Sequence, residues 1–253
     1  MYNIFGITQG QKAVDLSRAL PFVCEPGTKD FIDFYTWVVK GPDGTIVVDT
    51  GMDDHETKAM CTAKSYGGIK WLQEKFKQID VDPTKVEKVI VSHLHGDHFS
   101  AWSLYPKATF YIQQKDIDFF TGPGVVFQQV SRSAAKMSDV INLAYAKRIK
   151  FMDGDEQIAP GIKAVLVGGH TPGSQIVTVT TKKGEVVLCC DALDRYQQYT
   201  SRVIGGPADM LLSLFALDTI KKLASSEDLI VPGHEPLVMK RFPNPFEGVC
   251  EIA

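Results

Sequence analysis

The chain has 253 residues, of which 44% are hydrophobic and 23% are charged, enough for a sizeable folded core and too apolar for a disordered chain. Lysine and arginine (27) nearly balance aspartate and glutamate (30), and the formal net charge of -3 argues against a nucleic-acid partner, which would require clustered cations. No apolar run reaches the roughly eighteen residues of a membrane span, and the first residues lack an export signal, so we expect a cytoplasmic protein without a membrane partner.

Apolar, β-branched segments recur along the chain and predict strands. They lie at 45–48, 89–91, 108–112, 164–167, 176–179, 186–188 and 229–231. Because these segments are almost continuously hydrophobic, we expect sheets that are covered on both faces, either by helices or by a second sheet.

Helical spacing of apolar residues predicts helices between these strands. The clearest helix covers 207–224, and another carries Ile69 and Phe76 on its apolar side. A capped helix start at 53–56 precedes it, and the glycines at 67 and 68 separate the two.

The segment 115–146 combines a turn at 121–124 with helical stretches, and we expect it to be an insertion that caps a pocket. Its apolar residues are Phe119, Phe120, Phe127, Met137, Ile141 and Tyr145. No repeat, low-complexity tract or linker divides the chain, so the sequence predicts one mixed α/β domain over 1–253.

The cysteines follow no metal-binding spacing. The chain has five of them: Cys24, Cys61, Cys189, Cys190 and Cys250. An odd number of this kind indicates reduced, structural thiols, and the adjacent Cys189 and Cys190 should point to opposite faces of a strand.

Histidines are concentrated directly after predicted strands. Three of the six, His93, His95 and His98, lie with Asp97 in one short window after the strand at 89–91. His170, Asp191 and His234 follow three other strands, beside glycine or proline in the case of the two histidines. Strand ends are where open sheets build their sites, and imidazole and carboxylate groups are ligands that Zn²⁺ accepts.

Alternation along an extended segment can direct neighbouring ligands to different places. It can aim His93 and His95 at one ion and turn Asp97 and His98 toward another. The spacing therefore predicts a site for two metal ions.

These residues resemble the signature of the metallo-β-lactamase superfamily. His93, His95, Asp97 and His98 match its H-x-H-x-D-H element, and Asp49-Thr50-Gly51 matches its earlier D-T-G element. His170, Asp191 and His234 follow in the family's order. The resemblance implies an αββα four-layer sandwich.

The resemblance also implies a division of the ligands. The first metal would be held by His93, His95 and His170. The second would be held by Asp97, His98 and His234. Asp191 would bridge them, and Asp49 would be a buried carboxylate that orients the ligand loops.

The resemblance implies a dinuclear zinc hydrolase that opens a lactone or related ester of a small molecule by attack of a bridging hydroxide. Asp97 and Asp191 are candidates to accept or relay the proton. No serine or cysteine nucleophile is needed, so Cys189 and Cys190 need no catalytic role.

Within the superfamily, the chain most resembles the N-acyl homoserine lactonase group in its length and in its Asp49–Met52 junction. It departs at Asp194, which stands where that group usually has a tyrosine. Either Tyr196 or Tyr199 takes over as hydrogen-bond donor, or Asp194 faces the pocket and selects substrates that carry a donor or a positive charge, or Asp194 is a solvated loop residue.

Other activities of the superfamily remain open on the sequence alone. A thioesterase of the glyoxalase II type and a single-iron persulfide dioxygenase are the enzymatic alternatives. A non-catalytic metal-binding protein is the third alternative, which the complete set of seven ligands disfavours.

Overall fold

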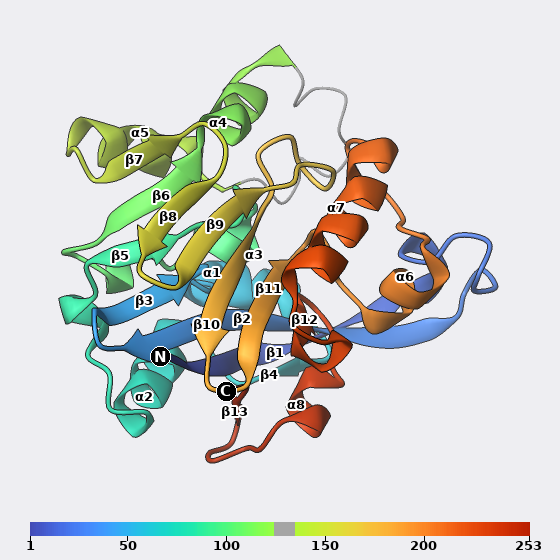
Figure 1. Cartoon of the computed structure of the whole chain (residues 1–253), viewed down its shortest axis with the longest axis horizontal. Helices are drawn as coiled ribbons and strands as arrows, with labels where there is room; N and C mark the ends of the chain where they lie inside the picture. Colours follow the sequence, from blue (N-terminus) through green and yellow to red (C-terminus); the bar gives the residue numbers. More distant parts are fainter. Residues whose placement is uncertain (124–134) are drawn as a thin grey trace.

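The computed structural model describes residues 1–123 and 135–253, and it contains two β-sheets packed face to face (Figure 1). In the first sheet the strands follow the order β13-β1-β2-β3-β5-β6-β7, and β4 pairs with β1. Their bounds are β1 (Asn3–Asp15), β2 (Lys29–Gly41), β3 (Gly44–Val48), β4 (Lys64–Ser65), β5 (Lys88–Ile90), β6 (Thr109–Gln113), β7 (Ile149–Met152) and β13 (Val249–Glu251). The strands β3, β5, β6 and β7 are parallel, so their carboxyl ends meet at one edge.

The second sheet has the order β12-β11-β10-β9-β8. Its strands are β8 (Glu156–Ala159), β9 (Ile162–Leu166), β10 (Gln175–Thr181), β11 (Gly184–Cys190) and β12 (Ile230–Pro232). Because β10 is antiparallel to both of its neighbours and β12 is parallel to β11, the strands β9, β11 and β12 run in the same direction. Their carboxyl ends therefore lie at one edge of this sheet.

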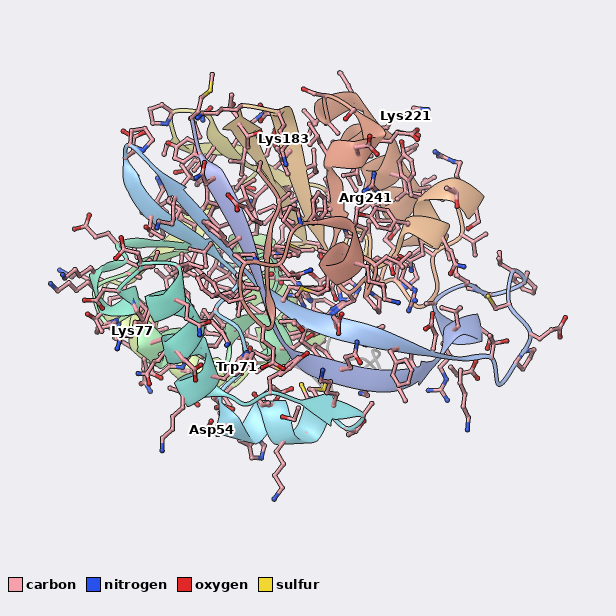
Figure 2. The ribbon with its side chains drawn as sticks, turned by 90° about the horizontal axis from the view of Figure 1, so that it is seen from below. Asp54, Trp71, Lys77, Lys183, Lys221 and Arg241 are labelled. Atoms are coloured by element: carbon pink, nitrogen blue, oxygen red, sulfur yellow. The ribbon has the colours of Figure 1, made fainter. Side chains whose placement is uncertain are left out.

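Helices cover the outer faces of both sheets. The helices of the described residues are α1 (Asp54–Met60), α2 (Ile69–Gln78), α3 (Gly96–Phe99), α4 (Gln114–Thr121), α5 (Met137–Tyr145), α6 (Tyr196–Ser201), α7 (Met210–Leu223) and α8 (Val238–Arg241), of which α2 packs on the first sheet and α7 on the second. Figure 2 shows Asp54, Trp71 and Lys77 of α1 and α2 on one side of the molecule, and Lys221 of α7 and Arg241 of α8 on the opposite side. None of the helices in the described ranges is long and apolar enough to cross a bilayer.

Three apolar clusters fill the spaces between these layers. The central cluster, with Trp37 and Leu188, lies between the two sheets. A second joins the outer face of the first sheet to Leu72 and Phe76 of α2, and a third joins β11 and β12 to α7. The four-layer αββα fold predicted from the sequence is thereby confirmed, as is the expectation that both faces of each sheet are covered.

The strands and helices predicted from the sequence are also present. The side chain of Asp53 caps α1 by accepting a hydrogen bond from Glu56 N, and the long helix begins at Met210, after its capping residue Asp209. The adjacent cysteines divide as expected, Cys190 facing the central cluster and Cys189 the α7 cluster. All five cysteines are free thiols.

The predicted cap at 115–146 contains α4 and α5, and its residue Phe127 lies outside the described residues. That the segment covers a pocket stays a prediction, as does the single-domain organisation.

Candidate metal centre

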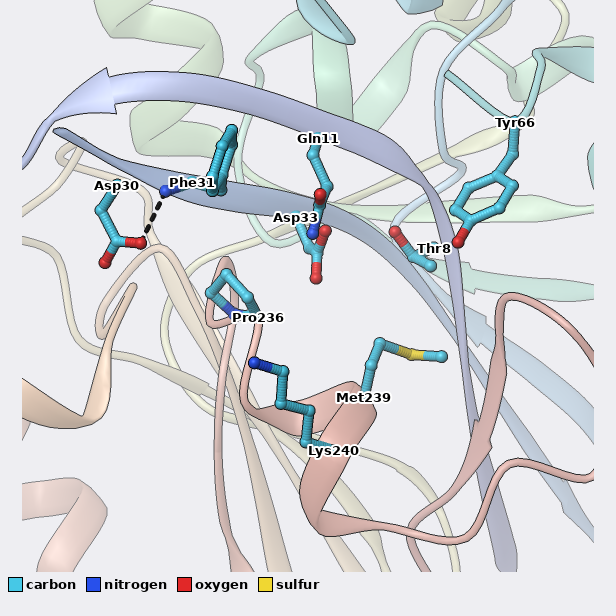
Figure 3. A pocket seen from close by; sticks show the side chains of 9 residues that line it. All are labelled: Thr8, Gln11, Asp30, Phe31, Asp33, Tyr66, Pro236, Met239 and Lys240. Atoms are coloured by element: carbon cyan, nitrogen blue, oxygen red, sulfur yellow. Dashed lines mark hydrogen bonds between the residues drawn. The ribbon is translucent and has the colours of Figure 1, made fainter. Parts of the chain in front are cut away.

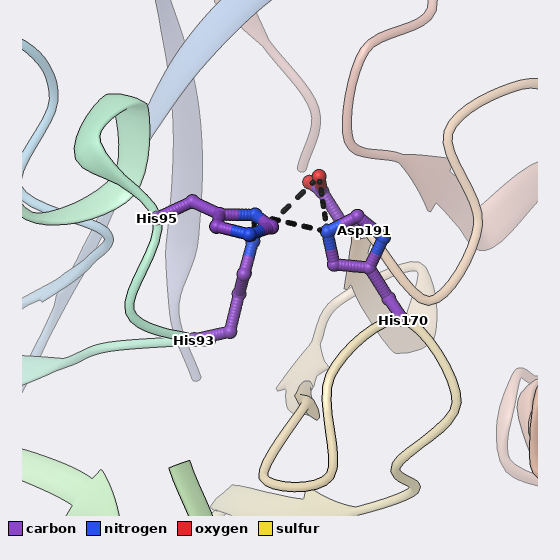
Figure 4. A group of neighbouring side chains, drawn as sticks. All are labelled: His93, His95, His170 and Asp191. Atoms are coloured by element: carbon purple, nitrogen blue, oxygen red, sulfur yellow. Dashed lines mark hydrogen bonds and ion pairs between the residues drawn. The ribbon is translucent and has the colours of Figure 1, made fainter. Parts of the chain in front are cut away.

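The first group of candidate ligands is formed by His93, His95, His170 and Asp191, whose ligand atoms all lie within 4.8 Å of one another (Figure 4). His95 Nδ1 is 2.8 Å from His93 Nε2 and 3.1 Å from His170 Nε2. Asp191 Oδ2 is 3.3 Å from His170 Nε2. The first sheet supplies His93 and His95 after β5, and the second sheet supplies His170 and Asp191 after β9 and β11.

The second group is formed by Asp97, His98 and His234. Asp97 and His98 lie in the short helix α3, and His234 follows β12. Asp191 Oδ1 is 3.1 Å from both His98 Nε2 and His234 Nε2. The two oxygens of Asp191 thus face different groups, Oδ2 the first and Oδ1 the second, as a bridging carboxylate requires.

Whether cations fit this cluster can be judged from its buried polar atoms. His98 Nε2 and Asp191 Oδ1 are fully buried and 3.1 Å apart, and neither makes a hydrogen bond of good geometry with any described residue. Leaving buried polar atoms unpaired is costly, whereas a cation between them would satisfy both. Imidazole nitrogens and carboxylate oxygens are a donor set that divalent transition metals accept, so the cluster is capable of binding metal.

The ionisation of the cluster reflects the same geometry. Burial alone would raise the pKa of Asp97, but His98 and His234 beside it lower this pKa below its usual range. Burial would lower the pKa of His234, yet Asp191 and Asp97 raise it to about 10. Burial and the neighbouring His170 lower the pKa of His95 to about 3. Without a cation, protons on His98 and His234 therefore balance the carboxylates, and these are the protons that a metal ion must displace.

Residues outside the cluster fix the orientation of its rings. Asp49, which follows β3, accepts hydrogen bonds from Ser92 N at 2.7 Å and Ser92 Oγ at 2.9 Å. Its Oδ2 lies 2.8 Å from His98 Nδ1, which leaves His98 Nε2 facing the cluster. His234 Nδ1 lies 2.7 Å from the carbonyl oxygen of Asp33. Asp49 thus holds the orienting position expected from the sequence.

Comparison with known proteins agrees with this geometry. The sequence profile of the Metallo-beta-lactamase superfamily matches residues 35–234, which is most of the chain. The chain belongs to the metallo-β-lactamase superfamily. It is 25% identical over 217 residues to an N-acyl homoserine lactonase of Bacillus cereus, covering 81% of this chain and 82% of that protein. It is 23% identical over 227 residues to the N-acyl homoserine lactonase AiiA of Bacillus thuringiensis subsp. kurstaki, covering 83% and 84%.

Solved structures show the same fold. A quorum-quenching N-acyl homoserine lactone lactonase superposes with a TM-score of 0.78 at 21% identity and covers 95% of each chain. The dizinc quorum-quenching lactonase AidC superposes with a TM-score of 0.72 at 16% identity and covers 93% of this chain and 88% of that one.

One carboxylate of this metallo-β-lactamase fold was missed by the sequence analysis. Asp116, in the first turn of α4, is buried and accepts hydrogen bonds from Leu94 N at 2.8 Å, Thr171 Oγ1 at 2.6 Å and Gly173 N at 2.8 Å. It therefore joins the loop that carries His93 and His95 to the loop that carries His170. The sequence feature that could have identified Asp116 is its position just after β6, because the carboxyl ends of β5 and β6 meet at the same edge of the sheet.

The alternative in which Tyr196 or Tyr199 takes over as hydrogen-bond donor finds no support in the contacts of these two residues. Tyr199 Oη donates a hydrogen bond to Glu227 at 3.3 Å. The guanidinium of Arg241 lies over the ring of Tyr196, with Cζ 5.1 Å from the ring centroid. Both residues lie in α6, and the contacts of Tyr199 Oη and of the Tyr196 ring are with residues outside the ligand cluster.

Asp194 lies beside the cluster. Its carboxylate, that of Asp191 and the ring of His234 offer ligand atoms within 4.8 Å of one another. Asp194 and His234 also line a cavity of about 560 Å³ between the β1–β2 hairpin and the chain that follows α6. This position favours the alternative in which Asp194 faces the pocket over the alternative of a solvated loop residue.

A different cavity, of about 380 Å³, is lined mainly by β1, β2 and α8 (Figure 3). It is lined by residues such as Gln11, Asp33, Tyr66 and Lys240, and it contains none of the candidate ligands. The larger cavity at His234 and Asp194 is thus the one that reaches the metal centre.

Proposed function

We propose that this protein is a dinuclear zinc hydrolase that opens the lactone ring of a small molecule. The observation that carries this proposal is Asp191, whose two oxygens face two groups of imidazole and carboxylate ligands next to a cavity. The relatives with the same fold and most of the same length are N-acyl homoserine lactonases, which supports a lactone as the substrate.

The protein supplies the ligands, the access and the proton acceptor. When bound, two zinc ions lower the pKa of water and polarise the carbonyl group under attack. His93, His95 and His170 hold one position, Asp97, His98 and His234 hold the other, and Asp191 joins them. His170 is the most accessible of these side chains, at 20% exposed against 8% for His234.

Asp97 and Asp191 are placed to move the proton that the reaction releases. Both carboxylates are buried within the ligand cluster, and Asp97 Oδ2 is 3.2 Å from His98 Nε2. A carboxylate at this place can take a proton from the attacking water and pass it to the leaving oxygen. Because Cys189 and Cys190 are buried and burial raises their thiol pKa values well above the ordinary range, neither is a nucleophile.

A hydrolysis screen of metal-replete protein tests the proposal, with N-acyl homoserine lactones, other lactones, thioesters, phosphodiesters and β-lactams as substrates. We expect lactones to be hydrolysed fastest, with loss of activity on chelation and recovery on addition of Zn²⁺. His170→Gln should abolish turnover. His55→Gln, which changes an exposed histidine outside the cluster, should leave turnover unchanged.

Two results would contradict this function. Fastest turnover of a thioester would identify a thioesterase. A single tightly held iron with oxygen consumption in the presence of a persulfide would identify a dioxygenase. Elemental analysis of the purified protein separates the iron result from the expected two zinc ions per chain.

A further inference from the structure

Asp194 is held next to His234 by the backbone and by a buried glutamine. His234 N donates to the carbonyl oxygen of Asp194 at 3.1 Å. Asp194 N donates to Gln198 Oε1 at 2.8 Å, and Gln198 is fully buried. The loop that follows β11 is thus fixed against the last histidine of the ligand set.

Only one of the two carboxylate oxygens of Asp194 has a hydrogen-bond partner within the described residues. Its Oδ2 accepts a hydrogen bond from Gln198 Nε2 at 3.3 Å. Its Oδ1 is fully buried and makes no hydrogen bond within the described residues. The adjacent cation, Arg195, is directed elsewhere, since its guanidinium binds Asp30 and the carbonyl oxygen of Phe31. A buried carboxylate oxygen without a hydrogen-bond donor is costly unless something else binds it.

We propose that Asp194 is an additional ligand of the cation held by Asp97, His98 and His234. This inference rests on the metal centre of the proposed function. It is supported by the short spacing of Asp191, Asp194 and His234, and independently by Asp194 Oδ1, which is buried and has no hydrogen-bond partner within the described residues.

The extra carboxylate makes the two metal positions chemically unlike. The first position has three imidazoles and one oxygen of Asp191. The second has two imidazoles, the other oxygen of Asp191, Asp97 and Asp194. Carboxylate ligands favour oxygen-preferring cations such as Mn²⁺, whereas imidazole suits zinc. The second position should therefore bind its cation more tightly than two histidines and Asp97 alone would, and it should accept Mn²⁺ more readily than the first.

Titration of the metal-free protein with Zn²⁺ and with Mn²⁺ tests this assignment, using wild type, Asp194→Asn and Asp218→Asn. Asparagine keeps the size of the side chain and the backbone contacts at position 194. Asp218→Asn makes the same charge change on α7, where the exposed Asp218 pairs with Arg202. We expect Asp194→Asn to weaken the second binding event at least 10-fold, because the loss of a direct ligand should cost no less than the loss of a group that only orients a ligand. The variant should also reduce Mn²⁺ binding more than Zn²⁺ binding. Asp218→Asn should bind both metals as wild type does.

Cobalt supplies a readout that does not depend on activity. The visible absorption of Co²⁺ at the second position reports its coordination, and it should change in Asp194→Asn and remain unchanged in Asp218→Asn. A second binding constant and a cobalt spectrum both equal to those of wild type would overturn the assignment. Because neither measurement uses a substrate, failure to hydrolyse lactones would refute the proposed function and leave this result standing.

Discussion

Asp49 Oδ2 and His98 Nδ1 lie 2.8 Å apart, and this contact sets the face that His98 presents to the cluster. Asp49 has a φ of 61°, a left-handed conformation that is uncommon outside glycine, directly where β3 ends. The strained backbone places the carboxylate between Ser92 and His98, and the two hydrogen bonds from Ser92 stabilise that position.

We expect Asp49→Asn to weaken metal binding at the second position by about 10–100-fold, the usual cost of losing a group that orients a ligand. The variant keeps an acceptor for Ser92 but loses the negative charge beside His98. Metal titration measures the effect. The control is Asp82→Asn, which changes an exposed carboxylate outside the ligand cluster. Wild-type affinity in Asp49→Asn would show that the ring of His98 is oriented by other contacts.

Asp191→Asn should reduce metal binding at both positions together. An amide offers one oxygen in place of two and carries no charge, so it cannot compensate two cations. Elemental analysis should find fewer than two ions per chain, and turnover should fall in parallel. Retention of two ions with full turnover would refute the bridging role.

Asp116→Asn should lower the free energy of unfolding by about 1–3 kcal/mol, since the amide that replaces Oδ2 cannot accept the hydrogen bond from Leu94 N and leaves it unpaired. Chemical denaturation measures this change. The matched control is Asp118→Asn in the same helix, whose exposed carboxylate accepts a hydrogen bond from Gln114 Nε2. Equal losses in the two variants would mean that Asp116 does not clamp the two ligand loops.

The single variants Tyr196→Phe and Tyr199→Phe should each keep kcat within about twofold of wild type. A hydroxyl that stabilised the developing oxyanion would cost roughly 100–1000-fold when removed. The structure directs Tyr199 Oη to Glu227 and Tyr196 toward Arg241. A large loss of kcat in either variant would require α6 to rearrange when substrate binds.

An alkylating reagent should modify Cys24 and leave the other thiols intact in the native protein. Cys24 is partly exposed, whereas Cys61, Cys189, Cys190 and Cys250 are buried, and burial raises the pKa of Cys250 to about 12. Mass spectrometry of the treated protein identifies the modified residues, and turnover should persist. Loss of turnover together with modification of Cys190 would assign that thiol a role in the reaction.

The sequence was most informative where polar residues follow directly after apolar strands. His93, His95, Asp97 and His98 stand out because a buried strand leads directly into them, and His170, Asp191 and His234 repeat that arrangement. The long strands β1 and β2 were missed, since Gly6, Gly10 and several polar residues break their apolar pattern while tertiary pairing still orders them.

Two other features could not be read from the sequence because they depend on contacts between distant segments. Asp116 acts on backbone groups of two loops that are near it only in the folded chain. The direction of Tyr196 and Tyr199 is set by the packing of α6 against Glu227 and Arg241. The resembling group usually has a tyrosine at the position of Asp194, so the resemblance could not say which side chain takes its place in this chain.

Each group of ligands draws on both sheets, with consequences for the order of folding. His93, His95, Asp97 and His98 come from the first half of the chain, and His170, Asp191 and His234 from the second half. Neither half can complete a metal position by itself, so tight metal uptake should occur only after the two halves have docked. Bound cations would then cross-link the two sheets and slow their separation. Tightly bound metal would be found only in chains that have folded correctly.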